Sequence, residues 1–420
     1  MTIISGNLLE PASAAFCGVR SRAIVRIDAD GRIADVEEGS TKAADVLGGE
    51  ERWIVPGFVD AHLHLPQWDR RGIDGYPLRE WFENVIYPAE ARFVDAALGE
   101  RLAEEFVTGL IANGTTTVAA FGSPFAEAAD RAFAVFARRG IRAVFGKMLN
   151  DMNCPAPLRE DADKALDEAR SLAARWHASE GGRLLYAFSP RTPVCCSEKL
   201  MRGAAALARM LGCPIQTHVA ESRSELVAAR ESFPDRIDEI DLLAEMGLLT
   251  PQTLLGHGVF LNRPQRNQVA RAGSAVVHCP TANLFLEAGI MDYAACRSAG
   301  IRVALGSSVA GGPDPFMPHV AVQCLQTAKG LRAHAIPPAS DTVPTPAEAW
   351  WLLTKGGAEA LNLADRIGAI APGYEADLLV VRPEPWIGHL PPEQQVSALL
   401  YTIRPDQIEH VFVAGRRVGP

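Results

Sequence analysis

Eight short apolar runs recur along this chain, and each is followed by an alanine-rich amphipathic stretch. Apolar strands that alternate with helices are typical of repeated βα units, whose parallel strands are buried on both faces. Eight alternations predict an α/β fold, a (β/α)8 barrel of the TIM type. The runs begin at Gly57, Thr115, Ile141, Leu184, Pro214, Thr253, Ser274 and Ile301.

The two ends of the chain have a different pattern. Residues 1–55 and 370–420 are rich in short alternating strands and turn signals, as in RAIVRIDADGRIADV and HVFVAGRRV. We therefore expect one small β-sandwich domain built from both termini, with the barrel spanning residues 56–369. No internal repeat, low-complexity tract or flexible linker separates these parts, so we expect one rigid body.

Composition limits the partners of the chain. The net charge of −9 would repel nucleic acid and anionic membranes, which makes a small-molecule substrate the simplest expectation. No apolar stretch reaches the length that a membrane span needs. The eight cysteines show no CxxC spacing, and the first residues, MTIISGNLLE, lack a secretory signal, so we expect a reduced, cytoplasmic protein.

Half of the ten histidines fall at the ends of the apolar runs. His62 and His64 end the first run, and their spacing places both rings on one face of a strand, where they suit a single metal ion. His218, His257 and His278 end the fifth, sixth and seventh runs. A lone histidine is more often structural, but the carboxyl ends of barrel strands are where active sites form. Together these histidines predict a metal site.

Three imidazoles from the first and fifth runs suit zinc or ferrous iron and leave room for water. Glu221 follows His218 by three residues, so its carboxyl group could carry protons during hydrolysis; the alternative is an exposed loop glutamate. His257 could hydrogen-bond the attacking water, or it could be a core histidine bonded to a backbone carbonyl. The fourth run, LLYAFSP, offers no lysine to bridge two metals, so one metal is the simpler expectation.

Several segments together resemble the amidohydrolase superfamily, and within it most closely the guanine deaminase family. They are PGFVDAHLHLPQ, LREWFENVIYPAEARF, GKMLNDMN, SPR followed by CS, QTHVAES, GHGVFL and HCPTANLFLEAGI. The resemblance covers essentially the whole chain and keeps the same order of segments. It implies a (β/α)8 barrel with a β-sandwich, zinc as the metal, hydrolytic loss of ammonia from a heterocycle, and a homodimer.

The resemblance also implies roles for individual residues. His62, His64 and His218 would be zinc ligands, Glu221 the proton shuttle, and His257 the group that orients the attacking water.

For substrate binding, the resemblance implies that Gln67, Trp81 and Arg191 line the pocket for the base. An amide can read the donor and acceptor edge of a ring, and a guanidinium can grip a carbonyl oxygen and a ring nitrogen. The family usually has a phenylalanine after this arginine, and here Thr192 takes its place. That departure affects the choice of substrate.

The eighth run departs from the family pattern. Relatives usually have a Thr-Asp pair before VAGG, and that aspartate both binds zinc and deprotonates water. This chain has Ser307 and Ser308 there, and a hydroxyl group is a poor base. Asp314 could supply the absent carboxylate if its loop turns back, but a solvated turn residue is the simpler interpretation.

These observations lead to one main hypothesis and two alternatives. We expect a metal-dependent aminohydrolase that holds one zinc per chain and releases ammonia from a purine-like heterocycle. Iron could replace zinc. The first alternative is a catalytically impaired or silent relative that binds a heterocycle or a partner, which the serine at position 308 suggests. The second is a related hydrolase whose leaving group is a halide or an amide nitrogen.

Overall fold

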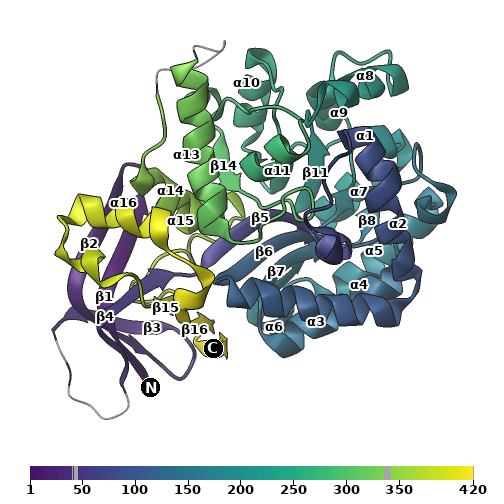
Figure 1. The fold of residues 1–420 in the computed structure, drawn as a ribbon. Coiled ribbons are helices and arrows are strands. Elements are labelled where there is room, and N and C mark those ends of the chain that lie inside the picture. The colour runs from purple at the N-terminus through teal and green to yellow at the C-terminus, as the bar shows by residue number, and fades with distance from the viewer. Residues whose placement is uncertain (40, 42–45, 335–341, 420) are drawn as a thin grey trace.

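The structure is a computed structural model that describes residues 1–39, 41, 46–334 and 342–419. Eight parallel strands form its core (Figure 1). They are β5 (Phe58–His64), β6 (Thr115–Phe121), β7 (Arg142–Gly146), β9 (Leu184–Tyr186), β11 (Ile215–Val219), β12 (Thr253–His257), β13 (Ala275–His278) and β14 (Arg302–Leu305). Each strand lies within one of the eight apolar runs, so the predicted (β/α)8 fold is confirmed.

Two four-stranded parallel sheets make up the barrel wall, in the orders β5-β6-β7-β9 and β11-β12-β13-β14. At one seam Phe188, just after β9, pairs in parallel with Ile215 of β11. At the other seam the backbone N–H of Ser308, just after β14, donates to the carbonyl of His62 in β5 (2.7 Å). The carboxyl ends of the strands therefore meet at one rim, where barrels place their functional groups.

The helices that follow the strands pack around this wall (Figure 1). α7 shows why they form where they do: Ser197 accepts a hydrogen bond from the Leu200 N–H at its start, and Gly212 ends it with a left-handed φ of 71°. The longer helices are α3 (Ala96–Ala112), α4 (Ala126–Arg139), α5 (Ala162–Trp176), α7 (Glu198–Leu211), α8 (Arg223–Ser232), α10 (Arg263–Ala272) and α13 (Met317–Ala333).

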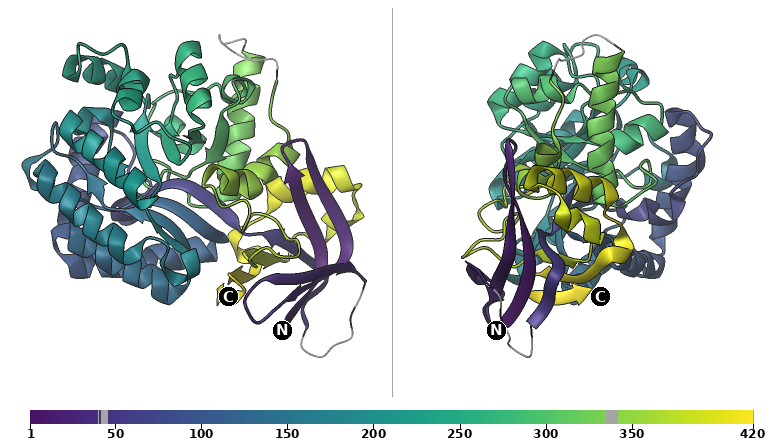
Figure 2. Two further views of the ribbon diagram at one scale, coloured as in Figure 1. Left: turned by 180° about the vertical axis from the view of Figure 1, so that it is seen from behind. Right: turned by 60° about the vertical axis from the view of Figure 1, so that its left-hand side comes forward.

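Strands from both ends of the chain form a seven-stranded sheet beside the barrel, as predicted (Figure 2). Its order is β17-β16-β15-β4-β1-β2-β3. The sheet bends back on itself, so that its two ends meet. The Ile33 N–H donates to the Tyr374 carbonyl, and the Ala376 N–H donates to the Gly31 carbonyl. The strands are β1 (Thr2–Ser13), β2 (Phe16–Ile27), β3 (Ile33–Glu38), β4 (Val46–Pro56), β15 (Leu378–Val381), β16 (Ile408–Val413) and β17 (Arg416–Gly419). The exact boundaries predicted for the two domains stay predictions.

A buried ion cluster ties the amino ends of the barrel strands to the segment that leads into β15. Arg142, the first residue of β7, is 1% exposed. Its Nε donates to Asp377 Oδ2 (2.9 Å), and its Nη2 donates to Glu375 Oε2 (2.7 Å). Arg366 donates to the other oxygen of Glu375 (2.7 Å). The barrel and the terminal sheet are therefore joined by opposite charges that compensate each other.

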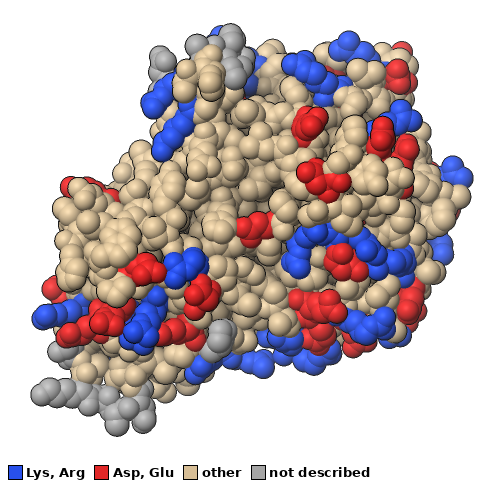
Figure 3. Space-filling view, viewed as in Figure 1, with Lys and Arg blue, Asp and Glu red and all other residues tan. Residues whose placement is uncertain are grey.

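On the face shown in Figure 3, acidic and basic side chains are interspersed. No helix among the described residues combines the length and the apolar character that crossing a bilayer requires. All eight cysteines are free of disulfide bonds.

Candidate active site

Four of the five rim histidines gather at the carboxyl ends of β5, β11 and β12. One ring nitrogen from each of His62, His218 and His257 lies within 4.8 Å of the others. His64 Nε2 lies 3.1 Å from His218 Nε2. Two nitrogens bound to one zinc ion are at most about 4.2 Å apart, because each Zn–N bond is about 2.1 Å. The three nitrogens that lie together are those of His62, His218 and His257, and the predicted ligand His64 adjoins them through its contact with His218.

The state of these rings suits a metal ion. His62 Nε2 and His64 Nδ1 are buried and have no hydrogen-bond partner among the described residues. Burial, with the neighbouring imidazoles, lowers the pKa of His62, His64 and His218 well below the usual value, so the rings are neutral. The backbone carbonyl of Arg191 lies 2.6 Å from His218 Nδ1. A proton on that nitrogen leaves the lone pair of Nε2 free for a metal.

Two glycines leave the space that the His62 ring occupies. A Cβ atom at Gly256 in β12 would lie 2.6 Å from His62 Cε1, and one at Gly306 after β14 would lie 2.7 Å from His62 Cβ. Any larger residue at either place would push the ring out of the cluster.

Glu221 and His257 form the second part of the site. Glu221 Oε1 lies 3.5 Å from His257 Nε2, and both side chains are buried. Burial raises the pKa of Glu221 to about 7, although Arg191 opposes this rise. His257 Nδ1 lies 2.8 Å from Asn283 Oδ1, which fixes its ring, and burial lowers its pKa to about 4. A carboxyl group with this pKa can both accept and donate a proton near neutral pH.

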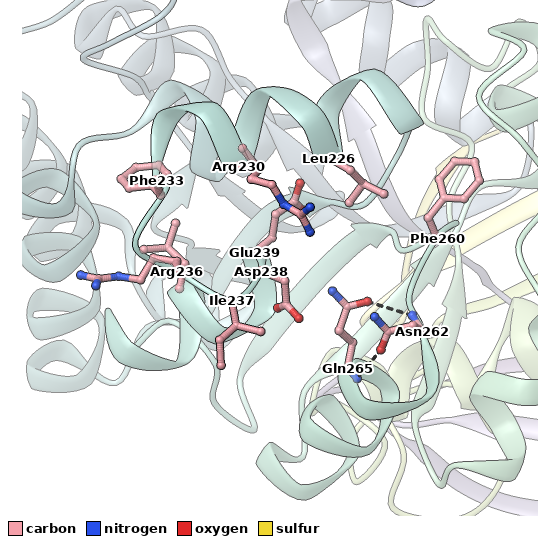
Figure 4. A pocket seen from close by; sticks show the side chains of 12 residues that line it. Leu226, Arg230, Phe233, Arg236, Ile237, Asp238, Glu239, Phe260, Asn262 and Gln265 are labelled. Atoms are coloured by element: carbon pink, nitrogen blue, oxygen red, sulfur yellow. Dashed lines mark hydrogen bonds between the residues drawn. The ribbon is translucent and has the colours of Figure 1, made fainter.

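Two further carboxyl groups hold the backbone around Glu221. Glu225 Oε2 accepts a hydrogen bond from the Glu221 N–H (2.8 Å), and Glu239 Oε2 accepts one from the Ala220 N–H (2.9 Å). Ala220 has a φ of 47°, a conformation that alanine rarely adopts without such support. Glu239 also lines a surface cavity of about 310 Å³ beside α8, α9 (Glu239–Glu245) and α10 (Figure 4).

A small cavity of about 20 Å³ lies against this group. Its lining includes His64, His218, His257 and Glu221 from the catalytic cluster, Gln67, Trp81 and Phe82 from the segment after β5, and Leu286, Ser308 and Gly311. The predicted pocket residues Gln67 and Trp81 therefore face the same space as the catalytic cluster. The indole N–H of Trp81 donates to the Ile73 carbonyl (3.0 Å), which fixes the ring.

The other two predicted pocket residues lie beside the cavity rather than in its wall. Arg191 is 2% exposed and pairs with Glu90, with Arg191 Nη1 2.5 Å from Glu90 Oε2. Although burial opposes it, Glu90 raises the pKa of Arg191 above its usual value. The hydroxyl of Thr192 accepts a hydrogen bond from the Val194 N–H (3.0 Å), so it caps a short turn.

The serine pair after β14 has two different environments. Ser307 donates from Oγ to Asp60 Oδ2 (2.5 Å) and from its N–H to Asp60 Oδ1 (2.9 Å). Burial raises the pKa of Asp60 to about 7, although these bonds oppose the rise. Ser308 lines the cavity. Asp314 lies outside the cavity wall, accepts from the Phe316 N–H (2.8 Å) and contacts His319, so it is the turn residue of the simpler interpretation.

Three residues that contact the site were not predicted from the sequence: Asp60, Glu90 and Asn283. Asp60 stands inside an apolar run, where a charged residue needs a partner. Glu90 lies in a short helix otherwise rich in apolar residues, and Asn283 follows the seventh run within HCPTANLF. A polar residue within an otherwise apolar segment is the sequence signal that could have identified them.

The comparisons with known proteins agree with this geometry. The model of the amidohydrolase family matches residues 53–418. The chain belongs to the amidohydrolase family. It is 33% identical over 381 residues to the probable guanine deaminase of Deinococcus radiodurans, covering 88% of this chain and 84% of that protein.

Solved structures of other amidohydrolases share the whole fold. The guanine deaminase of E. coli superposes with a TM-score of 0.92 and 26% identity over 99% of both chains. An adenosine deaminase from Xanthomonas campestris, with bound zinc, superposes with a TM-score of 0.87 and 25% identity, over 99% of this chain and 92% of that one. These likenesses extend over 99% of this chain, including the strands that carry the histidine cluster.

Proposed function

We propose that this chain is a metal-dependent aminohydrolase that releases ammonia from guanine or a closely related purine-like heterocycle. One observation carries the proposal: neutral histidines with unused nitrogens, a buried carboxyl group and a small cavity meet at one point of the barrel rim. The two guanine deaminases among the relatives support guanine as the substrate.

We further propose that the metal is zinc, one per chain, held by His62, His64 and His218. The nitrogen donors suit zinc, and the zinc in the adenosine deaminase neighbour supports this choice. A divalent metal bound there would supply the Lewis acidity that activates water for attack. The predicted homodimer and the predicted cytoplasmic location stay predictions.

The protein's own residues then account for the remaining chemistry. Gln67 and Trp81 hold the flat base against the catalytic cluster. Glu221 carries one proton of the attacking water to the ring nitrogen and then carries the second proton of that water to the leaving amine, which departs as ammonia; its pKa of about 7 allows both transfers. His257, fixed by Asn283, hydrogen-bonds the attacking oxygen.

A panel assay tests the proposal. Zinc-loaded protein is incubated with guanine, adenine, adenosine and a pterin, and released ammonia is measured together with the zinc content. We expect about one zinc per chain and the fastest release from guanine. No ammonia from any compound, with one zinc bound, would overturn the proposal.

Ser308 motivates a second candidate, a silent relative that binds the heterocycle without hydrolysis. No carboxylate takes the place of the usual aspartate in the cavity lining, where Glu221 is the one acidic side chain among the described residues. Calorimetric binding of guanine without ammonia release would select this second candidate.

A further inference from the structure

We propose that Glu90 is a positioning residue that fixes the amide of Gln67 and so makes the cavity select heterocycles with a ring carbonyl. This inference rests on the proposed function. Glu90 lies in α2 (Tyr87–Ala91), is fully buried, and lies outside the wall of the cavity. It acts through its neighbours rather than on the substrate.

The carboxylate of Glu90 connects two of the predicted pocket residues. Its Oε1 accepts hydrogen bonds from Arg191 Nη2 (3.1 Å) and from Gln67 Nε2 (3.2 Å), and its Oε2 accepts from Arg191 Nη1 (2.5 Å). The guanidinium also lies 5.2 Å from the centres of the Phe82 and Tyr87 rings. This buried ion pair is held on several sides and forms a fixed support for the Gln67 amide.

The amide of Gln67 has only one orientation that satisfies both of its neighbours. Its Oε1 accepts from the Ala310 N–H (3.2 Å), and its Nε2 donates to Glu90. A backbone N–H can only donate and a carboxylate can only accept, so a flipped amide would oppose like groups at both ends. Such a flip would leave buried polar groups unpaired, which costs about 1–3 kcal/mol for each group.

The fixed orientation gathers hydrogen-bond donors at one place. Gln67 Nε2 and Arg191 Nη2 bond to the same oxygen of Glu90, so they lie side by side, and each nitrogen carries a second hydrogen. Gln67 lines the cavity. The remaining N–H of Gln67 Nε2 is then the group that selects an acceptor atom of the ligand, and Arg191 supports it from outside the cavity lining. A ring carbonyl oxygen fits, whereas an amino group would place donors against donors.

Guanine and 2,6-diaminopurine test this selection directly, because they differ in a carbonyl or an amino group at one ring carbon and in the proton on the adjacent ring nitrogen. Both keep the amine whose loss releases ammonia. We define the selectivity ratio as kcat/KM for guanine divided by kcat/KM for 2,6-diaminopurine. In wild-type protein we expect this ratio to favour guanine strongly. Glu90→Gln offers the Gln67 amide a partner that can donate as well as accept, so the amide can turn. The ratio should fall at least about tenfold, mainly through a higher KM for guanine, with zinc content unchanged.

A merely structural role for Glu90 predicts a different result. Glu90→Gln leaves Arg191 buried without its charge partner, so the melting temperature should fall in any case. If that were the whole effect, both substrates would lose activity equally and the ratio would not change. Asp69→Asn is the matched control, because it removes the acceptor of an arginine, Arg92, at a more exposed site; this variant should keep the wild-type ratio.

A second variant keeps the test decisive if Glu90→Gln does not fold. Glu90→Asp retains the charge that Arg191 needs but is one methylene shorter, so it cannot hold both Gln67 and Arg191 as closely. We expect it to fold and to lose part of the selectivity. A wild-type ratio in each folded Glu90 variant would overturn the inference. Wild-type protein that releases ammonia from neither base would instead overturn the proposed function, and calorimetric binding of the two bases would then measure the selectivity.

Discussion

The two ends of the barrel bury polar groups in different ways. At the amino ends of the strands, Asp377 and Glu375 compensate the charge of the buried Arg142, although its Nη1 has no hydrogen-bond partner among the described residues. At the carboxyl ends, His62 and His64 each bury a ring nitrogen without a partner among the described residues. A buried nitrogen without a hydrogen-bond partner lowers the stability of the folded protein until a ligand bonds to it. One end of the barrel is therefore arranged for stability and the other for a ligand.

His218→Asn should have the largest effect on the carboxyl end. The variant removes one imidazole from the cluster, so zinc content should fall from about one per chain to near zero. Ammonia release from guanine should fall by at least about 10⁴-fold, because enzymes of this kind accelerate their reactions by 10⁶-fold or more. Elemental analysis and the ammonia assay measure the two effects.

The matched control for this variant is His389→Asn, which changes an exposed histidine outside the cluster in the same way. It should keep both zinc and activity. Full zinc occupancy in His218→Asn would show that the ligand set is wrong, and the contrast between the two ends of the barrel would lose its basis.

Glu221→Gln should have the next largest effect. The amide keeps the size and the burial of the side chain but cannot carry a proton, so kcat should fall by about 10² to 10⁴. KM and zinc content should change little, because Glu221 is not among the predicted ligands. Steady-state kinetics on zinc-loaded protein measures this separation. A fall in zinc content equal to the fall in kcat would assign Glu221 to the metal instead.

Ser308→Asp should have a smaller effect on activity than these two variants. The substitution adds a carboxyl group to a cavity where Glu221 is already present, so an enzyme adapted to serine should lose about tenfold in kcat/KM, which corresponds to about 1.4 kcal/mol. Ser308→Ala is the control for loss of the hydroxyl group alone. A gain of activity from a silent wild-type protein would instead favour the second candidate function.

Much of this architecture could be predicted from sequence because strand and helix periodicity is local. All eight barrel strands fall within the predicted runs, and the histidines that end the first, fifth and sixth runs meet at the rim. The parallel arrangement makes this possible, since it turns positions at strand ends into neighbours in space.

The partners of the buried polar groups were harder to predict, because each pairing joins residues far apart in the chain. Glu90 and Arg191 are separated by 101 positions, and Ser307 and Asp60 by 247. Nothing in the local sequence says which distant arginine a buried glutamate will meet. The resemblance predicts Arg191 in the pocket wall, and in this structure Arg191 bonds to Glu90, which also bonds to the lining residue Gln67.

Arg142→Met tests the amino end, where we expect no effect on catalysis. The methionine fills most of the space but leaves Asp377 buried without its cation, which should lower the free energy of unfolding by about 3–5 kcal/mol. Arg139→Met, which removes a more exposed pair with Glu104, should cost less than about 1 kcal/mol. Denaturant unfolding and steady-state kinetics on the folded protein separate the two quantities. If kcat fell together with stability in Arg142→Met, the ion cluster would be coupled to the histidine rim. The amino and carboxyl ends of the barrel would then not be independent, and the assignment of stability to one end and ligand binding to the other would fail.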